Sequence, residues 1–143
     1  MLDILYVEDN EDDADIFSRL IRKLNQPVTY TILPSGSEAI EYLTRQGRYS
    51  DEAAPLPKLV LLDLNLVGLS GFDVIERVRS TDRARGLPIV AFSTSDNPSD
   101  IQNAYEVGIN AYLVKPGNYQ QTGALLERLC QFWLNDNIRI DSK

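Results

Sequence analysis

Charged side chains stand directly after three apolar runs of the sequence, at the point where each run stops. They are Glu8 and Asp9 after residues 4–7, Asp63 after residues 59–62, and Lys115 after residues 111–114. A charge at the end of a buried strand is costly unless another group pairs it. A site that binds a cation and a phosphoryl group would pair all of these charges at once, because the cation pairs with the carboxylates and the phosphoryl group with the lysine.

Three carboxylates in one partly buried cleft would repel one another, and this repulsion raises their pKa values. A hard divalent cation removes the repulsion. Mg²⁺ takes oxygen ligands and commonly uses one or two carboxylates together with phosphate oxygens. We therefore predict a Mg²⁺ site at Glu8, Asp9 and Asp63, with the backbone carbonyl of Asn65 as a possible further ligand.

The carboxylate of Asp63 is also a candidate nucleophile, because aspartates form aspartyl-phosphates in some phosphoryl-transfer proteins. Such a transfer needs mainly positioning and charge neutralisation, which a metal and Lys115 would supply. Ser93, at the end of the apolar residues 88–92, could donate a hydroxyl hydrogen bond, and Thr94 is a competing candidate. The chain has no histidine, so a phosphohistidine donor would have to belong to another protein.

A parallel sheet is the scaffold that would bring these residues together. Strand and helix patterns alternate five times, with strands expected at residues 4–7, 28–33, 59–63, 88–92 and 111–114, and helices beginning near Asn10, Ser35, Gly71, Pro98 and Tyr119. The first helix is expected to reach about residue 25 and the last about residue 135, and residues 47–57 form a polar loop. Near-continuous apolar strands are typical of a parallel sheet covered on both faces. We predict an α/β, flavodoxin-like (βα)5 doubly wound fold with strand order 2-1-3-4-5, whose ligands bind between strands 1 and 3.

Composition limits the remaining possibilities. The 143 residues, 43% of them hydrophobic, fit one globular domain, expected at residues 1–136 with a short tail at 137–143. The net charge is −7, and seven acids precede residue 16, which argues against direct nucleic-acid binding. Among these acids we expect Glu11, Asp12 and Asp13 simply to favour a helix N-terminus.

No apolar run approaches the roughly 20 residues of a membrane span. Together with the lone Cys130, expected to be a buried helix residue, this indicates a cytoplasmic protein.

Taken together, these pieces resemble the receiver domain of bacterial response regulators. The matching segments are residues 4–10, 61–66 with Gly71, 88–94 and 112–116. The resemblance implies Asp63 as the phosphoacceptor, Asp9 as a direct Mg²⁺ ligand, Glu8 as a water-mediated ligand and the Asn65 carbonyl as another. It also implies Ser93 as the switch hydroxyl, Tyr112 as the switch aromatic, Lys115 as the phosphate-pairing lysine, and a cis peptide bond before Pro116.

A narrower resemblance concerns the loop at residues 48–57 and the late segment at residues 131–134. Both are similar to the single-domain response regulators found with bacterial phytochromes. The family implies a sensor histidine kinase as partner, and this narrower resemblance makes a bacterial phytochrome a candidate for that kinase.

Three functions are compatible with the residues. The first is a stand-alone response regulator, not an enzyme of multiple turnover, that is phosphorylated on Asp63 and signals through its fourth helix, fifth strand and fifth helix. The second is a receiver-like interaction module that is never phosphorylated. The third is an aspartyl-phosphate hydrolase, although such enzymes usually carry a second acid where this chain has Asn65.

The last helix is apolar over more than one stripe, at Leu125, Leu126, Leu129, Cys130, Phe132, Trp133 and Leu134. A helix of this kind usually buries a second face. We therefore expect a homodimer through the face formed by the fourth helix, fifth strand and fifth helix. The alternative is a terminal helix whose end packs on its own domain.

Overall fold

Five parallel strands form one sheet in the computed structural model, which describes residues 2–50 and 54–140. The strands are β1 (Leu2–Val7), β2 (Tyr30–Leu33), β3 (Pro57–Leu62), β4 (Ile89–Ser93) and β5 (Ala111–Val114). Their order is β2-β1-β3-β4-β5, so the predicted topology is confirmed. The register places Val7 of β1 beside Leu62 of β3, and the residues that follow these two strands therefore leave the sheet side by side.

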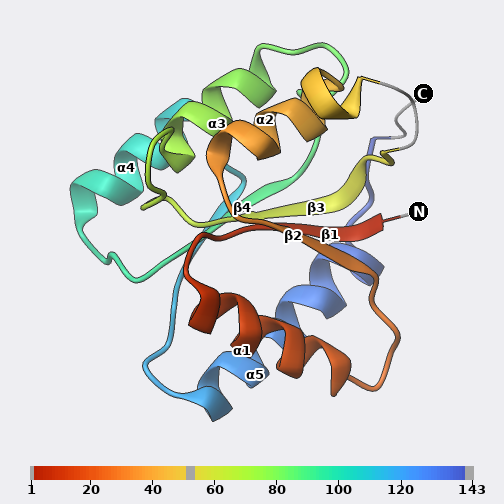
Figure 1. The fold of residues 1–143 in the computed structure, drawn as a ribbon. Coiled ribbons are helices and arrows are strands. Elements are labelled where there is room, and N and C mark those ends of the chain that lie inside the picture. The colour runs from red at the N-terminus through yellow and green to blue at the C-terminus, as the bar shows by residue number, and fades with distance from the viewer. Residues whose placement is uncertain (1, 51–53, 141–143) are drawn as a thin grey trace.

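Helices cover both faces of the sheet, as Figure 1 shows. They are α1 (Glu11–Arg22), α2 (Gly36–Thr44), α3 (Gly71–Arg79), α4 (Pro98–Val107) and α5 (Tyr119–Cys130), with a 3-10 turn η1 (Gly47–Tyr49) and a π-helical segment η2 (Gln131–Asp136). One face carries α1 and α5, and the other carries α2, α3 and α4 (Figure 1). The apolar residues 4–7 of β1 and 59–62 of β3 are buried between these two layers, as their near-continuous apolar sequence predicted.

Side-chain caps set where the helices begin. Asn10 caps α1 and Ser35 caps α2, each through a hydrogen bond to the backbone N–H three residues on. Pro98 occupies the first turn of α4, and Gly108 ends that helix with φ of 128°. These starts and stops confirm the sequence signals, because a cap is a local interaction that needs no tertiary partner.

Several element ends differ from the expected bounds. α1 stops at Arg22, β2 begins only at Tyr30, and α5 changes to π-helical hydrogen bonding after Cys130. β2 begins where its pairing with β1 begins, since Tyr30 is opposite Ile4. Met1, residues 51–53 of the expected loop and residues 141–143 of the expected tail lie outside the described residues.

The fifth strand is less buried than its apolar sequence predicted. Its residues are half-buried and Val114 is exposed, because β5 is an edge strand with a neighbour on one side only. Cys130, by contrast, is fully buried at the end of α5, where it packs in the core between the sheet and the α1–α5 layer, as expected. Within the described residues, no helix is both long enough and apolar enough to cross a bilayer.

Candidate functional site

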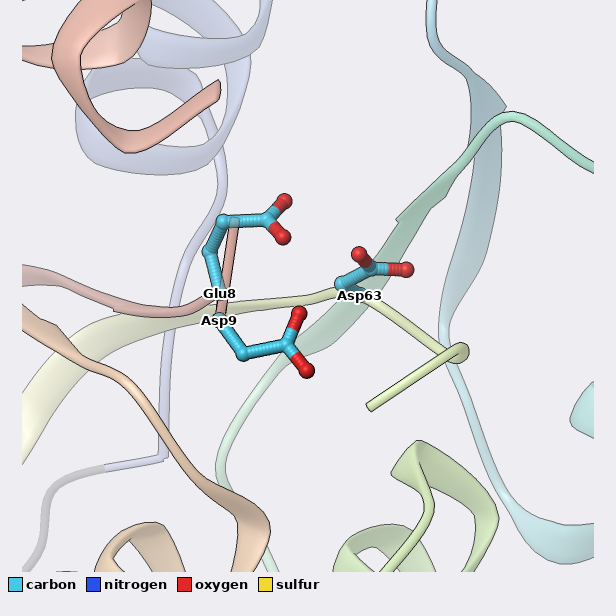
Figure 2. Close-up of side chains that lie close together, drawn as sticks. All are labelled: Glu8, Asp9 and Asp63. Carbon is cyan, nitrogen blue, oxygen red and sulfur yellow. The ribbon is translucent and has the colours of Figure 1, made fainter. Parts of the chain in front are cut away.

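Three carboxylates meet at the carboxyl edge of the sheet, where Glu8 and Asp9 follow β1 and Asp63 follows β3 (Figure 2). One oxygen from each residue lies within 4.8 Å of the others. Glu8 and Asp63 are buried, and Asp9 is half-buried at the rim. Three hard oxygen donors from two adjacent strands suit a hard divalent cation, so the donor set fits Mg²⁺ or a similar ion.

Both carboxylate oxygens of Glu8 accept hydrogen bonds from protein groups. Oε1 accepts from the Tyr6 hydroxyl at 2.8 Å and from the Lys115 ammonium at 2.5 Å, and Oε2 accepts from the backbone N–H of Asn10 at 3.1 Å. Burial and the nearby Asp63 raise the pKa of Glu8, although Lys115 acts in the opposite direction. Sequence reasoning missed Tyr6, but its position two residues before Glu8 places both side chains on one side of the strand.

The ammonium of Lys115 is surrounded by carboxylates. It lies 2.5 Å from Glu8 Oε1, 3.0 Å from Asp13 Oδ2 and 3.4 Å from Asp63 Oδ2. Burial alone would lower the pKa of Lys115, but the hydrogen bond to Glu8 and the charge of Asp63 outweigh it, and the pKa is raised. The lysine is therefore held as a cation within reach of the predicted phosphoacceptor.

Asp13 is the second residue that sequence reasoning missed. It was expected only to favour the start of α1, yet its side chain reaches Lys115, which is 102 positions later in the chain. Helical spacing places Asp13, four residues before the buried Phe17, on the apolar face of α1 and leaves Asp12 off that face, but this pattern specifies no partner for Asp13. Only the packing of the start of α1 beside the segment after β5 brings the two charges together.

The loop between β3 and α3 closes over the carboxylates. The backbone N–H of Asn65 donates to Asp63 Oδ1 at 3.0 Å, and the N–H of Val67 donates to Asp9 Oδ2 at 2.9 Å. These bonds orient both carboxylates from the same loop. The expected role of the Asn65 carbonyl as a metal ligand stays a prediction.

The hydroxyl of Ser93 lies at the end of β4 and is fully buried. Its Oγ accepts from the side-chain amide of Asn65 at 3.3 Å and from the backbone N–H of Ser95 at 3.2 Å. Thr94, the competing candidate, is exposed. The Tyr112 hydroxyl donates to the carbonyl of Ser95 at 2.8 Å, so one loop residue contacts both predicted switch residues.

The expected cis bond before Pro116 is wrong for this structure. The part of the chain that the structure describes contains no cis peptide bond, so Lys115 and Pro116 are joined in trans. The two isomers of an X-Pro bond differ by only about 0.5–1 kcal/mol, and the dipeptide by itself therefore does not select one.

Comparison with known proteins agrees with this geometry. The sequence model of the response regulator receiver domain matches residues 4–127. Response regulator Rcp1 of Synechocystis sp. is 32% identical over 131 residues, which cover 92% of this chain and 88% of Rcp1.

Two solved structures share the whole fold. The phosphorylated cyanobacterial phytochrome response regulator RcpA superposes with a TM-score of 0.89 at 29% identity, covering 99% of this chain and 100% of RcpA. The Mn²⁺-bound form of Rcp1 superposes with a TM-score of 0.88 at 30% identity, with the same coverage of 99% and 100%. The protein described here therefore belongs to the response regulator receiver domain family.

Proposed function

We propose that this chain is a stand-alone response regulator that accepts a phosphoryl group on Asp63 from the phosphohistidine of a sensor histidine kinase. The observation that carries the proposal is the position of Lys115, whose ammonium lies 3.4 Å from Asp63 Oδ2 beside the three-carboxylate group. A nucleophilic carboxylate, a cation for the transferred oxygens and a set of metal ligands are the parts that such a transfer needs.

Glu8, Asp9 and Asp63, with the Asn65 carbonyl, would hold the Mg²⁺ ion of this reaction. The ion would neutralise charge on the transferred phosphoryl group. The Mn²⁺-bound form of Rcp1 supports this assignment, because Mn²⁺ and Mg²⁺ favour the same carboxylate, carbonyl and water ligands.

In the proposed transfer, a carboxylate oxygen of Asp63 forms a bond to phosphorus while the P–N bond of the kinase phosphohistidine breaks. The electron pair of that bond returns to the imidazole nitrogen. Lys115 pairs with a phosphoryl oxygen, and the Ser93 hydroxyl donates to another. Asn65 and Val67 hold the carboxylates of Asp63 and Asp9 in place from the loop above them.

The signal is proposed to leave through α4, β5 and α5. The added negative charge would draw Ser93 toward the phosphoryl group and away from Ser95. Because the Ser95 carbonyl also accepts from the Tyr112 hydroxyl, movement of this loop would release the aromatic ring of β5. The contacts of Ser95 thus provide a direct connection from the site to this face.

We further propose that this face forms a homodimer. Two of its elements expose a large apolar side chain, namely Tyr105 on α4 and Val114 on β5. In sedimentation velocity, Val114→Asp is expected to give monomers, whereas Ile138→Asp, at an exposed site in the tail, leaves the dimer intact. A wild-type chain that is monomeric with and without its phosphoryl group would contradict the dimer.

The similarity to RcpA, a phytochrome response regulator, supports a bacterial phytochrome as the partner kinase. A kinase of this kind and the single buried thiol of Cys130 fit a cytoplasmic protein. The proposed receiver domain is residues 1–136, followed by a short tail at 137–143.

The decisive experiment is incubation with Mg²⁺ and a small phosphodonor, followed by intact-mass measurement. We expect one phosphoryl group on the wild type and on Asp12→Asn, which removes an exposed acid of α1, and none on Asp63→Asn or after chelation of Mg²⁺. Equal labelling of Asp63→Asn and the wild type would rule out the proposal. A wild type that is never labelled would favour the interaction module, and sustained hydrolysis of phosphate esters would favour the hydrolase.

A further inference from the structure

Asp13 differs from the other two carboxylates that hold Lys115. Glu8 and Asp63 belong to the three-carboxylate group that fits a metal, and Asp13 does not. Its carboxylate lies 3.0 Å from the Lys115 ammonium, closer than that of Asp63 at 3.4 Å. The lysine side chain is 9% exposed and that of Asp13 is 39% exposed, so this ion pair is largely shielded on the lysine side.

The ammonium of Lys115 has three hydrogen-bond donors, and each has one carboxylate acceptor in this structure. A divalent cation at Glu8, Asp9 and Asp63 would attract the oxygens of two of these acceptors and repel the lysine. Asp13 is then the acceptor that remains to hold the ammonium beside the site.

The surroundings of Lys115 leave it room to move if this anchor is lost. A cavity of about 230 Å³ lies beside the lysine, between the start of α1 and the segment after β5. Asp13, Lys115 and the ring of Phe92 line it, and the ammonium is already 5.7 Å from the centre of that ring. The lysine therefore has room, and a favourable ring face, within this cavity.

We propose that Asp13 is a positioning residue that keeps the Lys115 ammonium next to Asp63 when the metal and the phosphoryl group occupy the site. The inference rests on the proposed function and adds to it a residue outside the metal group. The Asp13 side chain then has a second role. Its first, favouring the N-terminus of α1, is one that Asp12 fills equally well.

The test compares Asp13→Asn with the matched variant Asp12→Asn by calorimetric titration with Mg²⁺ alone and with fluoroberyllate in the presence of Mg²⁺. Both variants lose one acid from the first turn of α1. We expect Asp13→Asn to bind fluoroberyllate about tenfold more weakly than Asp12→Asn, a difference of about 1.4 kcal/mol. The Kd for Mg²⁺ alone is expected to agree within about twofold between the two variants, since neither carboxylate belongs to the metal-binding group and a charge outside that group contributes little there.

Two further variants separate positioning from general destabilisation. Asp13→Glu is expected to restore most of the fluoroberyllate affinity, and Asp13→Asn is expected to have no further effect in a Lys115→Ala background. Equal fluoroberyllate affinity of Asp13→Asn and Asp12→Asn would overturn the inference, and so would tighter binding by Asp13→Asn, which would make Asp13 a competitor of the phosphoryl group. A wild type that binds neither Mg²⁺ nor fluoroberyllate would instead refute the proposed function and this inference together.

Discussion

The hydroxyl of Tyr6 donates a 2.8 Å hydrogen bond to Glu8 Oε1, the same oxygen that accepts from Lys115. Both residues are buried, and burial raises the pKa of the Tyr6 phenol far above its usual value, so the phenol stays a donor. A buried carboxylate that carries a charge is costly unless hydrogen bonds satisfy it. Tyr6 therefore fixes the direction of Glu8 from inside the sheet.

Removing this hydroxyl should destabilise the fold. For Tyr6→Phe we expect the free energy of unfolding to fall by about 1.5–3 kcal/mol, the usual contribution of a hydrogen bond to a charged group. Tyr30→Phe is the matched control, because Tyr30 also packs its ring on Phe17. If urea denaturation gives the same loss in free energy of unfolding for both variants, the hydrogen bond to Glu8 contributes nothing to stability.

Gly71 is predicted to be essential for the geometry around Asp63. A Cβ at Gly71 would lie 2.6 Å from the Asp63 carbonyl oxygen and 2.7 Å from the Leu64 Cα, and both are backbone atoms that cannot turn aside. Gly71→Ala should therefore cost about 1–3 kcal/mol of stability and reduce phosphoryl incorporation.

Gly117→Ala provides the control for Gly71, since nothing lies within 4 Å of a Cβ there. Its stability is expected to stay within about 0.5 kcal/mol of the wild type. Thermal melts of the two variants measure the difference. Equal melting temperatures would mean that the backbone near Asp63 relaxes around the added methyl group.

Arg79 connects the end of α3 to the amino ends of β4 and β5. Its guanidinium donates four hydrogen bonds of 2.7–2.8 Å, to the carbonyls of Gly108, Arg85 and Leu87 and to Asn110 Oδ1. All four acceptors are neutral, and burial lowers the pKa of Arg79. A lysine has three donors and no planar fork, so it cannot reproduce this set.

We therefore expect Arg79→Lys to lower the free energy of unfolding by about 2 kcal/mol, because it leaves part-buried carbonyls without a donor. Arg77→Lys is the comparison, since the exposed Arg77 makes a 3.3 Å bond to Gln46 and should tolerate the change within about 0.5 kcal/mol. Chemical denaturation of both variants tests this, and a small effect at Arg79 would show that water replaces the guanidinium.

The thiol of Cys130 should be unreactive in the folded protein. The side chain is fully buried, and burial raises its pKa from 9.0 to about 12. At pH 8 a thiol reagent is expected to label Cys130 only after unfolding in denaturant. Rapid labelling of the native protein would mean that the end of α5 opens easily.

The raised pKa of Cys130 also predicts how the stability of the protein depends on pH. The folded state holds the proton of the Cys130 thiol more tightly than the unfolded state. The contribution of this protonated thiol to the free energy of unfolding is therefore complete below pH 9 and is lost as the pH rises toward 12. The loss amounts to about 1.4 kcal/mol per pH unit in that window. Cys130→Ala should show a shallower decline above pH 9, and parallel curves for the two proteins would contradict the assignment.

Local patterns in the sequence determined the fold class, the strand order and the positions of the helix starts. Aliphatic strands that alternate with capped helices allow few topologies, and parallel strands place their carboxyl ends at one edge. Glu8, Asp9, Asp63 and Lys115 could therefore be assigned to one site before their distances were known. Caps such as Asn10 and Ser35 were also predictable, because the groups involved are three residues apart.

Tertiary packing decided what depends on residues far apart in the chain. Helical spacing places Asp13 and not Asp12 on the apolar face of α1, yet only the placement of α1 beside the segment after β5 pairs Asp13 with Lys115. The trans bond before Pro116 and the half-exposed strand β5 were likewise decided by their surroundings, because neither an X-Pro dipeptide nor an apolar run specifies its neighbours. The sequence alone thus placed Glu8, Asp9, Asp63 and Lys115 at one edge of the sheet. The three-dimensional packing determined which of them pair, because ion pairing depends on distances of a few ångströms that no local pattern encodes.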